Sequence, residues 1–280
     1  MKIVTTVDEV RDIVGQWRKD GLTIGFVPTM GYLHEGHMSL MQKSINGNDK
    51  TVASIFVNPM QFGPTEDLGT YPRDFQRDKE MCENLGIDLI FHPDVSEMYD
   101  DGFCSYINMS KVTETLCGAS RPVFYKGVCT VVGKLFNIVR PDKAYFGEKD
   151  AQQLLVIKRM VKDLNFGVEI IGGEIIREPD GLAKSSRNAY LDESQRKAAL
   201  ILNKALTAGK EKFFAGERNS TTLKAYIRDI INTEPMAEVE YVEAVDWNNA
   251  QTILTLDKPF LMAIAVRIGK VRLIDNFIIK

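Results

Sequence analysis

Residues 22–37 read LTIGFVPTMGYLHEGH, and this stretch decides how the first half of the chain is expected to fold. The apolar run from Leu22 to Val27 predicts a buried strand, and the polar residues after it predict the start of a helix. Two of the chain's 3 histidines, His34 and His37, fall at this junction. The first turn of a helix has unpaired backbone N–H groups and a positive dipole end, so the junction favours phosphate binding.

The same order, a short β-branched run followed by a helical pattern, repeats over about the first 175 residues. The expected strands are Leu22–Val27, Thr51–Val57, Ile87–Phe91, Lys143–Phe146 and Val168–Ile171. The expected helices, which carry apolar residues at spacings of three and four, are Gly36–Ile45, Asp74–Leu85, Cys129–Val139 and Ala151–Leu164. Alternating strands and helices predict the α/β class, with a Rossmann-like parallel sheet covered by helices on both faces.

The pattern changes after Gly172 and Gly173. Two polar helical stretches are followed by three strand-like runs, the last two joined by a glycine turn at Gly269. The helical stretches are Asp192–Phe214 and Thr221–Ile231, and the strands are Val239–Val245, Leu261–Ile268 and Val271–Phe277. We therefore expect a smaller α+β domain over residues 176–280, after a first domain over residues 1–175.

The composition of the 280 residues is that of an ordinary globular protein, with 44% hydrophobic and 26% charged residues. The net charge of −3 argues against a nucleic-acid partner, because nucleic-acid surfaces normally show a strong basic excess. The 4 cysteines form no C-x-x-C pair, so neither a zinc site nor a dithiol motif is supported. Reduced thiols that fill space are the simpler interpretation.

The first 15 or so residues lack the basic and then apolar pattern of a signal peptide. No apolar run approaches the roughly 20 residues that a membrane span requires. From these observations we expect a cytoplasmic protein with no membrane partner.

The two histidines suit phosphoryl or adenylyl transfer, because imidazole donates hydrogen bonds whether it is neutral or charged. Gly31 and Gly36 would allow a ligand to approach the backbone closely. A zinc site is not supported, since helical zinc proteases space their histidines as H-E-x-x-H, one residue further apart. Two ordinary surface histidines remain the alternative at this level.

Three further groups of polar residues accompany the histidine pair. Lys184–Asn188 offers cations and hydroxyls to a phosphate, although a solvated basic loop has the same composition. In Gly147–Asp150, Lys149 could hold a phosphate, and Asp150 could hold a ribose hydroxyl or a metal, or cap the next helix. Asn58–Gly63 sets two amides and a glycine after another strand. Ligands bind at the carboxyl ends of parallel strands, so the groups that follow strands are expected to meet there.

Together these runs resemble the pantothenate synthetase (pantoate–β-alanine ligase) family of the nucleotidyltransferase superfamily, with its HxGH and KMSKS-like motifs. The resemblance covers nearly the whole chain and weakens after about residue 200. It rests on the runs FVPTMG (26–31), HEGH (34–37), SIFVNPMQFG (54–63), FGEKD (146–150) and KSSRN (184–188). Lys184 departs from the family, many of whose members carry methionine there, so its backbone rather than its side chain would contact ATP.

The resemblance implies a two-step reaction. Pantoate carboxylate attacks the α-phosphate of ATP, which enters with Mg²⁺, and gives pantoyl adenylate and pyrophosphate. The amine of β-alanine then attacks the acyl carbon and releases pantothenate and AMP. The resemblance also implies a homodimer formed through the N-terminal domain, and no tightly bound prosthetic group.

The site residues are carried over position by position. His34, His37 and Lys149 would be catalytic, with His37 preferred as the proton donor. ATP would contact Met30, Gly31, Tyr32, Leu33, His34, Glu35, Gly36, His37, Gly147, Glu148, Lys149, Asp150, Ile176, Lys184, Ser185, Ser186 and Arg187. Pantoate would be held by Gln61, Gln153 and Asn58, with residues 62–73 as a gate that keeps water from the adenylate.

Three alternatives compete with this interpretation. Another adenylate-forming enzyme of the superfamily would share the ATP motifs but act on a different acid, and Asn58–Gly63 and Gln153 argue against it. A nucleotide-binding regulatory protein without catalytic activity is disfavoured by the intact histidine pair and by Lys149. A metal-dependent hydrolase fails because the histidine spacing is wrong.

Overall fold

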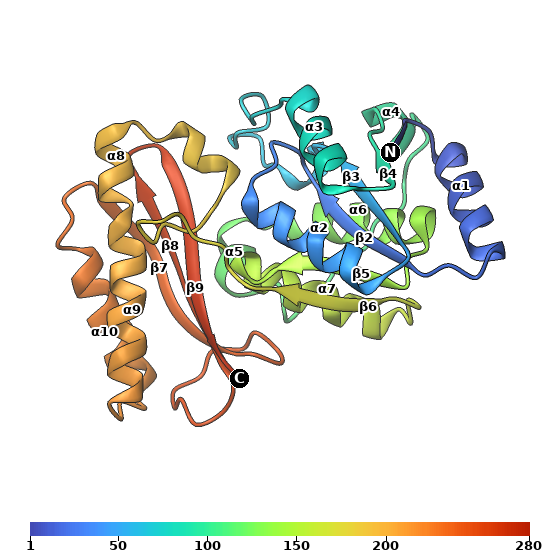
Figure 1. Ribbon diagram of the computed structural model, residues 1–280. Helices are drawn as coiled ribbons and strands as arrows, with labels where there is room; N and C mark the ends of the chain where they lie inside the picture. The colour runs from blue at the N-terminus through green and yellow to red at the C-terminus, as the bar shows by residue number, and fades with distance from the viewer. The chain divides into compact units, whose positions relative to one another are not determined.

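The computed structural model describes residues 1–280, and the chain forms two compact units (Figure 1). Unit 1 comprises Met1–Met109, Arg121–Glu148 and Val156–Glu174. Unit 2 comprises Ser110–Ser120, Lys149–Leu155 and Ile175–Lys280. Two short segments that precede residue 176, Ser110–Ser120 and Lys149–Leu155, thus belong to unit 2.

A six-stranded sheet forms the centre of unit 1, with the order β1-β4-β3-β2-β5-β6. Every neighbouring pair is parallel, which confirms the predicted α/β class. The strands are β1 Lys2–Val4, β2 Ile24–Thr29, β3 Lys50–Ile55, β4 Leu89–Phe91, β5 Lys143–Gly147 and β6 Glu169–Gly173. The sequence did not reveal β1, because a strand with one buried side chain leaves no readable pattern.

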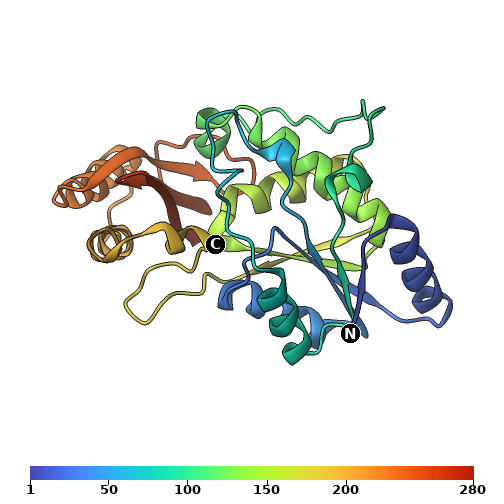
Figure 2. The ribbon, with the colours of Figure 1, turned by 90° about the horizontal axis from the view of Figure 1, so that it is seen from above.

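Helices cover both faces of this sheet. Figure 2 shows α2 and α3 on one side and α6 on the other. The helices among residues 1–175 are α1 Val7–Lys19, α2 Glu35–Gly47, α3 Phe75–Leu85, α4 Val95–Met98, α5 Leu116–Ser120, α6 Phe124–Val139 and α7 Ala151–Asp163, with short 3₁₀ turns η1 Pro59–Gln61 and η2 Glu148–Asp150; of these, α5 and the start of α7 belong to unit 2. The sequence missed α1, which buries only Val10 and Val14, and it started α6 five residues late.

The strand order places β2 and β5 side by side at the centre of the sheet. From β2 the chain continues to β3 on one side, whereas from β5 it continues to β6 on the other. The carboxyl ends of β2 and β5 therefore form the topological switch point, where ligands of open α/β sheets bind. Met30 is the first residue after β2, and Glu148 is the first after β5.

Unit 2 contains a three-stranded antiparallel sheet with the order β7-β8-β9. Its strands are β7 Ala237–Asp246, β8 Phe260–Ile268 and β9 Val271–Ile279, and its helices are α8 Glu193–Ala198, α9 Leu200–Phe214 and α10 Ser220–Ile231, with η3 Ser186–Tyr190 before them. Gly269 makes the predicted glycine turn with a φ of +58°. The predicted helix Asp192–Phe214 is two helices, although Ala199 between them keeps helical backbone angles (φ −62°, ψ −19°).

Each unit has its own hydrophobic core. In unit 1, side chains of β2, β3 and β4 pack against α2 and α3, with Val27 and Ile90 fully buried. In unit 2, apolar faces of α9 and α10 pack against the sheet around Phe260, whose ring makes edge contacts with Phe213 and Phe277. None of the helices combines the length and the hydrophobicity that a membrane span requires.

Candidate active site

The loop after β2 has an unusual backbone. Gly31 and Tyr32 are both in the left-handed region, with φ values of +82° and +48°. A Cβ on Gly31 would lie 2.9 Å from Oδ2 of Asp78 and 3.0 Å from Cγ2 of Ile55. Both the backbone angle and the lack of space therefore require glycine at position 31.

The side chain of Asp78, a residue of α3, stabilises this turn. Its side chain is buried, and its two oxygens accept hydrogen bonds from the backbone N–H groups of Tyr32 and Leu33, each at 2.7 Å. Burial raises the pKa of the Asp78 carboxyl, while the two backbone donors and Arg77 act in the opposite direction. We did not predict Asp78 from the sequence; the available signal was an acidic residue on the buried face of an amphipathic helix.

The two histidines form the N-terminal cap of α2. The N–H of Gly36 donates to Nδ1 of His34 at 3.1 Å, and the N–H of His34 donates to Nδ1 of His37 at 3.3 Å. The ring centroids are 4.0 Å apart. Because Nδ1 accepts in each ring, the proton of the neutral imidazole is on Nε2. Both rings therefore present an N–H donor without carrying a charge.

After β3, Asn58 caps η1 and is 1% exposed. Its Oδ1 accepts from the hydroxyl of Tyr99 at 2.8 Å and from the N–H of Met60 at 3.3 Å. Its Nδ2 donates to Oε1 of Gln61 and to the carbonyl of Gly127, both at 3.1 Å. These four hydrogen bonds occupy both the oxygen and the nitrogen of the Asn58 side-chain amide. The Asn58 side chain is therefore fixed in a position from which it orients Gln61.

Gln61 is nearly buried, and its Nε2 lies 3.0 Å from Sδ of Met30. The structure thus brings together two predicted site residues from the loops after β2 and β3. Arg121, which the sequence did not single out, donates to the Gln61 carbonyl at 3.2 Å and from Nε to Glu66 at 2.8 Å. Arg121 therefore holds the start of the predicted gate segment, residues 62–73.

The residues after β5 leave the sheet in a short 3₁₀ turn, Glu148–Asp150, before α7. Within unit 2, the Lys149 ammonium lies 3.8 Å from the Asp150 carboxylate. The backbone carbonyl of Lys149 accepts a hydrogen bond from the Asn276 side-chain amide at 2.9 Å. Gln153 is half-buried on α7. Its neighbour Gln152 is buried and donates to the carbonyls of Val112 and Thr115 at 3.1 and 2.7 Å, which is a structural role.

The basic motif of unit 2 follows a small hairpin that turns at Gly181, whose φ is +97°. Arg177 in this hairpin donates to both carboxylate oxygens of the buried Asp275 on β9, at 2.7 and 3.0 Å. The guanidinium also donates to the Gly181 carbonyl at 3.1 Å. A bidentate ion pair therefore fixes the hairpin to the sheet of unit 2.

Lys184 follows this hairpin directly. Its backbone N–H donates to the Ile176 carbonyl at 2.9 Å, and its ammonium lies 2.8 Å from Glu178. Ser185 caps η3 and accepts from the N–H of Arg187 at 3.3 Å, while Ser186 is nearly buried. The structure therefore brings Ile176 and Lys184 together and folds the motif as a capped turn.

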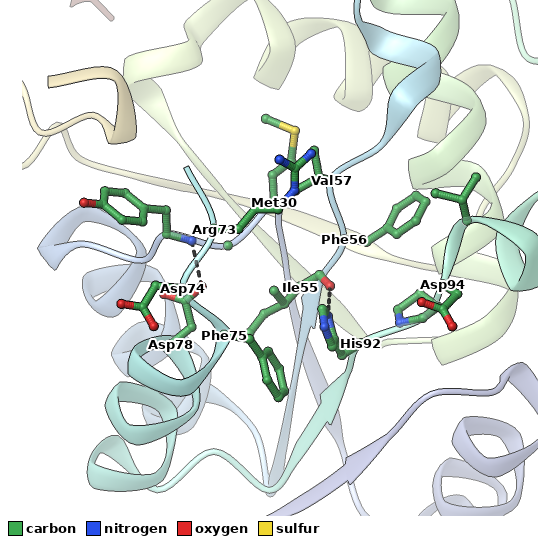
Figure 3. Close-up of a pocket in the computed structure, with 14 residues that line it drawn as sticks. Met30, Ile55, Phe56, Val57, Arg73, Asp74, Phe75, Asp78, His92 and Asp94 are labelled. Atoms are coloured by element: carbon green, nitrogen blue, oxygen red, sulfur yellow. Dashed lines mark hydrogen bonds between the residues drawn. The ribbon is translucent and has the colours of Figure 1, made fainter. Parts of the chain in front are cut away.

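A cavity of about 340 Å³ lies beside the loop after β2 (Figure 3). It is lined by the residues after β2, β3 and β4 and by the start of α3, including Met30, Arg73, Asp78, His92 and Asp94. His92, the third histidine, has its Nδ1 2.7 Å from the Ile55 carbonyl and stacks on Phe75 at 4.1 Å. His92 therefore lines this cavity, whereas His34 and His37 are not among its lining residues.

No group of three or more His, Cys, Asp or Glu side chains is arranged to hold a metal ion. The four cysteines are all unpaired, and only Cys104 is exposed. In chemical terms, the loops after β2 and β3 supply uncharged hydrogen-bond donors, and the motifs of unit 2 supply cations. Such donors bind and polarise phosphate and carboxylate groups.

Comparison with known proteins agrees with this geometry. The family model described as "Pantoate-beta-alanine ligase" matches residues 2–278. A pantothenate synthetase of Ruminiclostridium cellulolyticum is 58% identical over 277 residues, which is 99% of this chain and 98% of that protein. One from Clostridium botulinum is 56% identical over 280 residues, with both chains covered completely.

Solved structures give the same result. The pantothenate synthetase of Thermus thermophilus superposes with a TM-score of 0.94 at 42% identity, covering 99% of both chains. A pantoate-beta-alanine ligase of Francisella tularensis, solved with "Beta-gamma ATP" and beta-alanine, has a TM-score of 0.80 at 34% identity and covers 99% of this chain and 97% of that one. These matches confirm the resemblance inferred from the motifs. The chain belongs to the pantoate-beta-alanine ligase family.

Proposed function

We propose that this chain catalyses the ATP-dependent condensation of pantoate with β-alanine, with release of AMP and pyrophosphate. The observation that carries the proposal is the pair of Nε2–H donors at the cap of α2, beside a loop whose Met30 contacts Gln61. Within one unit, the histidine Nε2–H groups are available to a phosphate of ATP, and the Gln61 amide is available to the acid substrate. That the acid is pantoate and the amine β-alanine is inferred from the family to which the chain belongs.

The first step joins pantoate to AMP. A carboxylate oxygen of pantoate attacks the α-phosphorus of ATP, and the bond from that phosphorus to the bridging oxygen breaks, so pyrophosphate leaves. His34 and His37 donate hydrogen bonds from Nε2 to the phosphates, with His37 as the main donor to the leaving pyrophosphate, and Lys149 adds positive charge. Donors that face developing negative charge are commonly the largest catalytic contribution.

The second step forms the amide. The unprotonated amine of β-alanine attacks the acyl carbon, the carbon–oxygen bond to AMP breaks, and the amine loses a proton. Gln61 and Gln153 hold the pantoyl group in both steps, and Asn58 acts on it through Gln61. Holding the reactants in the attacking geometry supplies much of the rate, because no covalent enzyme intermediate is required.

The remaining ATP contacts are proposed from the family motifs. The loop Met30–His37 and the turn Gly147–Asp150 would line the nucleotide, together with Ile176 and Lys184–Arg187. ATP would enter with Mg²⁺ held by its own phosphates. The residues 1–175 would bind ATP and pantoate, and the residues 176–280 would act as a lid. A cytoplasmic homodimer formed through the first domain is part of the proposal, and sedimentation velocity would test it.

An AMP-release assay tests the function directly. Purified protein is incubated with Mg–ATP and pantoate, with β-alanine or with glycine and γ-aminobutyrate as matched amines of different length. AMP formation that requires both pantoate and β-alanine supports the proposal. AMP formation with other acids but not with pantoate would instead support a different adenylate-forming enzyme. Nucleotide binding without any AMP would support the regulatory alternative.

A further inference from the structure

The turn at Gly31 and Tyr32 requires an explanation. Two consecutive residues have positive φ values of +82° and +48°, and Tyr32 is not a glycine. The left-handed region is unfavourable for a residue with a Cβ, so such a turn persists only where its surroundings hold it. The hydroxyl of Thr29 accepts from the N–H of Gly31 at 3.1 Å, but this contact does not reach the next two N–H groups.

Asp78 supplies those two contacts. Its carboxylate is 1% exposed, and each oxygen accepts one backbone N–H at 2.7 Å, from Tyr32 and from Leu33. The same helix places the Arg77 guanidinium 5.1 Å from the centre of the Tyr32 ring and 4.0 Å from the Asp78 carboxylate. A buried charged acceptor that binds two main-chain donors is a strong interaction, and α3 thereby fixes the turn through two backbone atoms.

The surroundings give the turn room to change when this contact is lost. The cavity of about 340 Å³ is lined by Met30, Gly31 and Tyr32 of the turn and by Asp78, and Figure 3 labels Met30 and Asp78 among its lining residues. Close packing normally prevents loop movements, but a cavity removes that restraint. The carboxylate of Asp78 is therefore the main restraint on the turn.

The turn also connects the parts that the proposed reaction uses. Met30, before the turn, contacts Gln61, and His34, after it, caps α2. Leu33 between them is fully buried, so a displacement of its N–H would be passed to the histidine cap. Asp78 thus acts on the position of the histidine cap through the backbone of Leu33.

We propose that Asp78 is a positioning residue for ATP: its carboxylate holds the Gly31–Leu33 turn so that the loop and the histidine cap of α2 fit the phosphates. The inference rests on the proposed function, because it takes ATP as the ligand of this loop. Asp78 touches no substrate in this role and acts through the backbone. This positioning role also explains why the Asp78 carboxylate is buried beside a cavity.

The test is Asp78→Asn, which keeps the shape of the side chain but leaves one of the two N–H groups without an acceptor. We expect the KM for ATP to rise by about tenfold or more, the magnitude that one unsatisfied buried donor produces. The KM for β-alanine should stay within about twofold, since β-alanine enters only in the second step. A variant that is merely less folded would lose kcat and keep the KM for ATP, and that result would overturn the inference.

Asp142→Asn is the matched control. The Asp142 carboxylate accepts the N–H of Ile24 at 2.7 Å, at the opposite end of the same strand β2, and its replacement should leave both KM values unchanged. If Asp78→Asn does not fold, Asp78→Glu is the second variant. It keeps the charge but displaces the carboxylate oxygens, and the cavity has space for the added methylene. An unchanged KM for ATP in Asp78→Glu also overturns the inference. A wild-type protein that releases no AMP would contradict the proposed function, whereas an active wild type with an unaffected Asp78→Asn variant contradicts only the role of Asp78.

Discussion

Two loops carry most of the expected ATP contacts, residues 30–37 of unit 1 and residues 176–187 of unit 2, and they are stabilised differently. The first is fixed by backbone hydrogen bonds to the buried Asp78 and to imidazole nitrogens. The second is fixed by ion pairs between side chains, Arg177 with Asp275 and Lys184 with Glu178.

The difference predicts which loop can adjust. Backbone contacts to a buried carboxylate define the main-chain path and leave the histidines as uncharged donors. The side chains of Lys184 and Glu178 are each about a fifth exposed. A partly solvated ion pair contributes little to stability and exchanges partners readily. We infer that the first loop is preformed, whereas the second contains a cation that can change partner. The following predictions test this contrast, from the largest expected effect to the smallest.

Replacing His37 with alanine removes an Nε2–H donor from the preformed loop. We expect adenylate formation to slow by about a hundredfold to a thousandfold, the usual loss for one such donor, with ATP affinity much less affected. Pyrophosphate release under single-turnover conditions and calorimetric ATP binding measure the two quantities. Pyrophosphate release at the wild-type rate would remove His37 from the mechanism.

Replacing Arg177 with methionine leaves the buried Asp275 without its cation. The free energy of unfolding should fall by about 3 kcal/mol, as for a buried pair that loses one partner. Urea denaturation measures it. Arg196→Met is the matched control, because Arg196 pairs with the more exposed Asp180 and should cost less than about 1 kcal/mol. Equal losses in both variants would show that the bidentate pair is not the main anchor of the second loop.

Replacing Gln61 with alanine removes the amide that contacts Met30 of the first loop. We expect the KM for pantoate to rise by about tenfold, the equivalent of one lost hydrogen bond to a charged group, with ATP affinity nearly unchanged. Steady-state kinetics with each substrate varied in turn provides the measurement. An unchanged KM for pantoate would exclude Gln61 from the pantoate site.

Replacing Lys184 with methionine introduces the residue that many family members carry. Because its ion pair is partly solvated, we expect stability to change by less than about 1 kcal/mol. We expect kcat to change by no more than about threefold, well below the loss of a catalytic donor. Thermal unfolding and the AMP-release assay measure these effects. A hundredfold loss of kcat would instead make the Lys184 side chain part of the catalytic machinery.

The buried Asp78 of the first loop's support and the exposed Asp180 of the second loop should respond to pH in opposite directions. Burial raises the pKa of Asp78 above its ordinary value of 3.8, although the hydrogen bonds from the Leu33 and Tyr32 N–H groups lower it, so the folded state loses stability as pH rises through that pKa. The hydrogen bond from Arg196 lowers the pKa of Asp180 below 3.8, so its contribution is lost only as pH falls further.

The backbone amides report these two titrations by NMR. The Tyr32 and Leu33 amides should titrate with a midpoint above 3.8, and the Leu182 amide, which donates to Asp180 at 3.3 Å, with a midpoint below it. In Asp180→Asn the Leu182 titration should disappear while the Tyr32 titration remains. A common midpoint for both loops would contradict the contrast between them.

The sequence predicted the site motifs well where they are contiguous. His34 and His37 are three residues apart, and a strand followed by a helix start was enough to place them at the cap of α2. Asp78, Tyr99 and Arg121 were missed, because each meets its partner across 41 to 60 residues of chain. The one local signal was for Asp78, an acidic residue on the buried face of an amphipathic helix; Tyr99 and Arg121 have none.

The amide residues show the same limit in more detail. The sequence placed Asn58 and Gln61 together after a strand but assigned both to the substrate. The structure shows that Tyr99 and Gly127 complete the hydrogen bonds of Asn58, so only the amide nitrogen of Gln61 points toward the first loop. Hydrogen-bond saturation depends on distant donors and acceptors, which a linear pattern does not contain.

What the sequence by itself determined is the local order of strands, turns and helices, the α/β class and the family motifs, because periodicity and short motifs act over a few residues. What only the tertiary structure decided is how those motifs are held: the carboxylate of Asp78 under a left-handed turn, and the ion pair of Arg177 with Asp275. Such contacts depend on burial and on atoms brought within about 3 Å by the folded sheet.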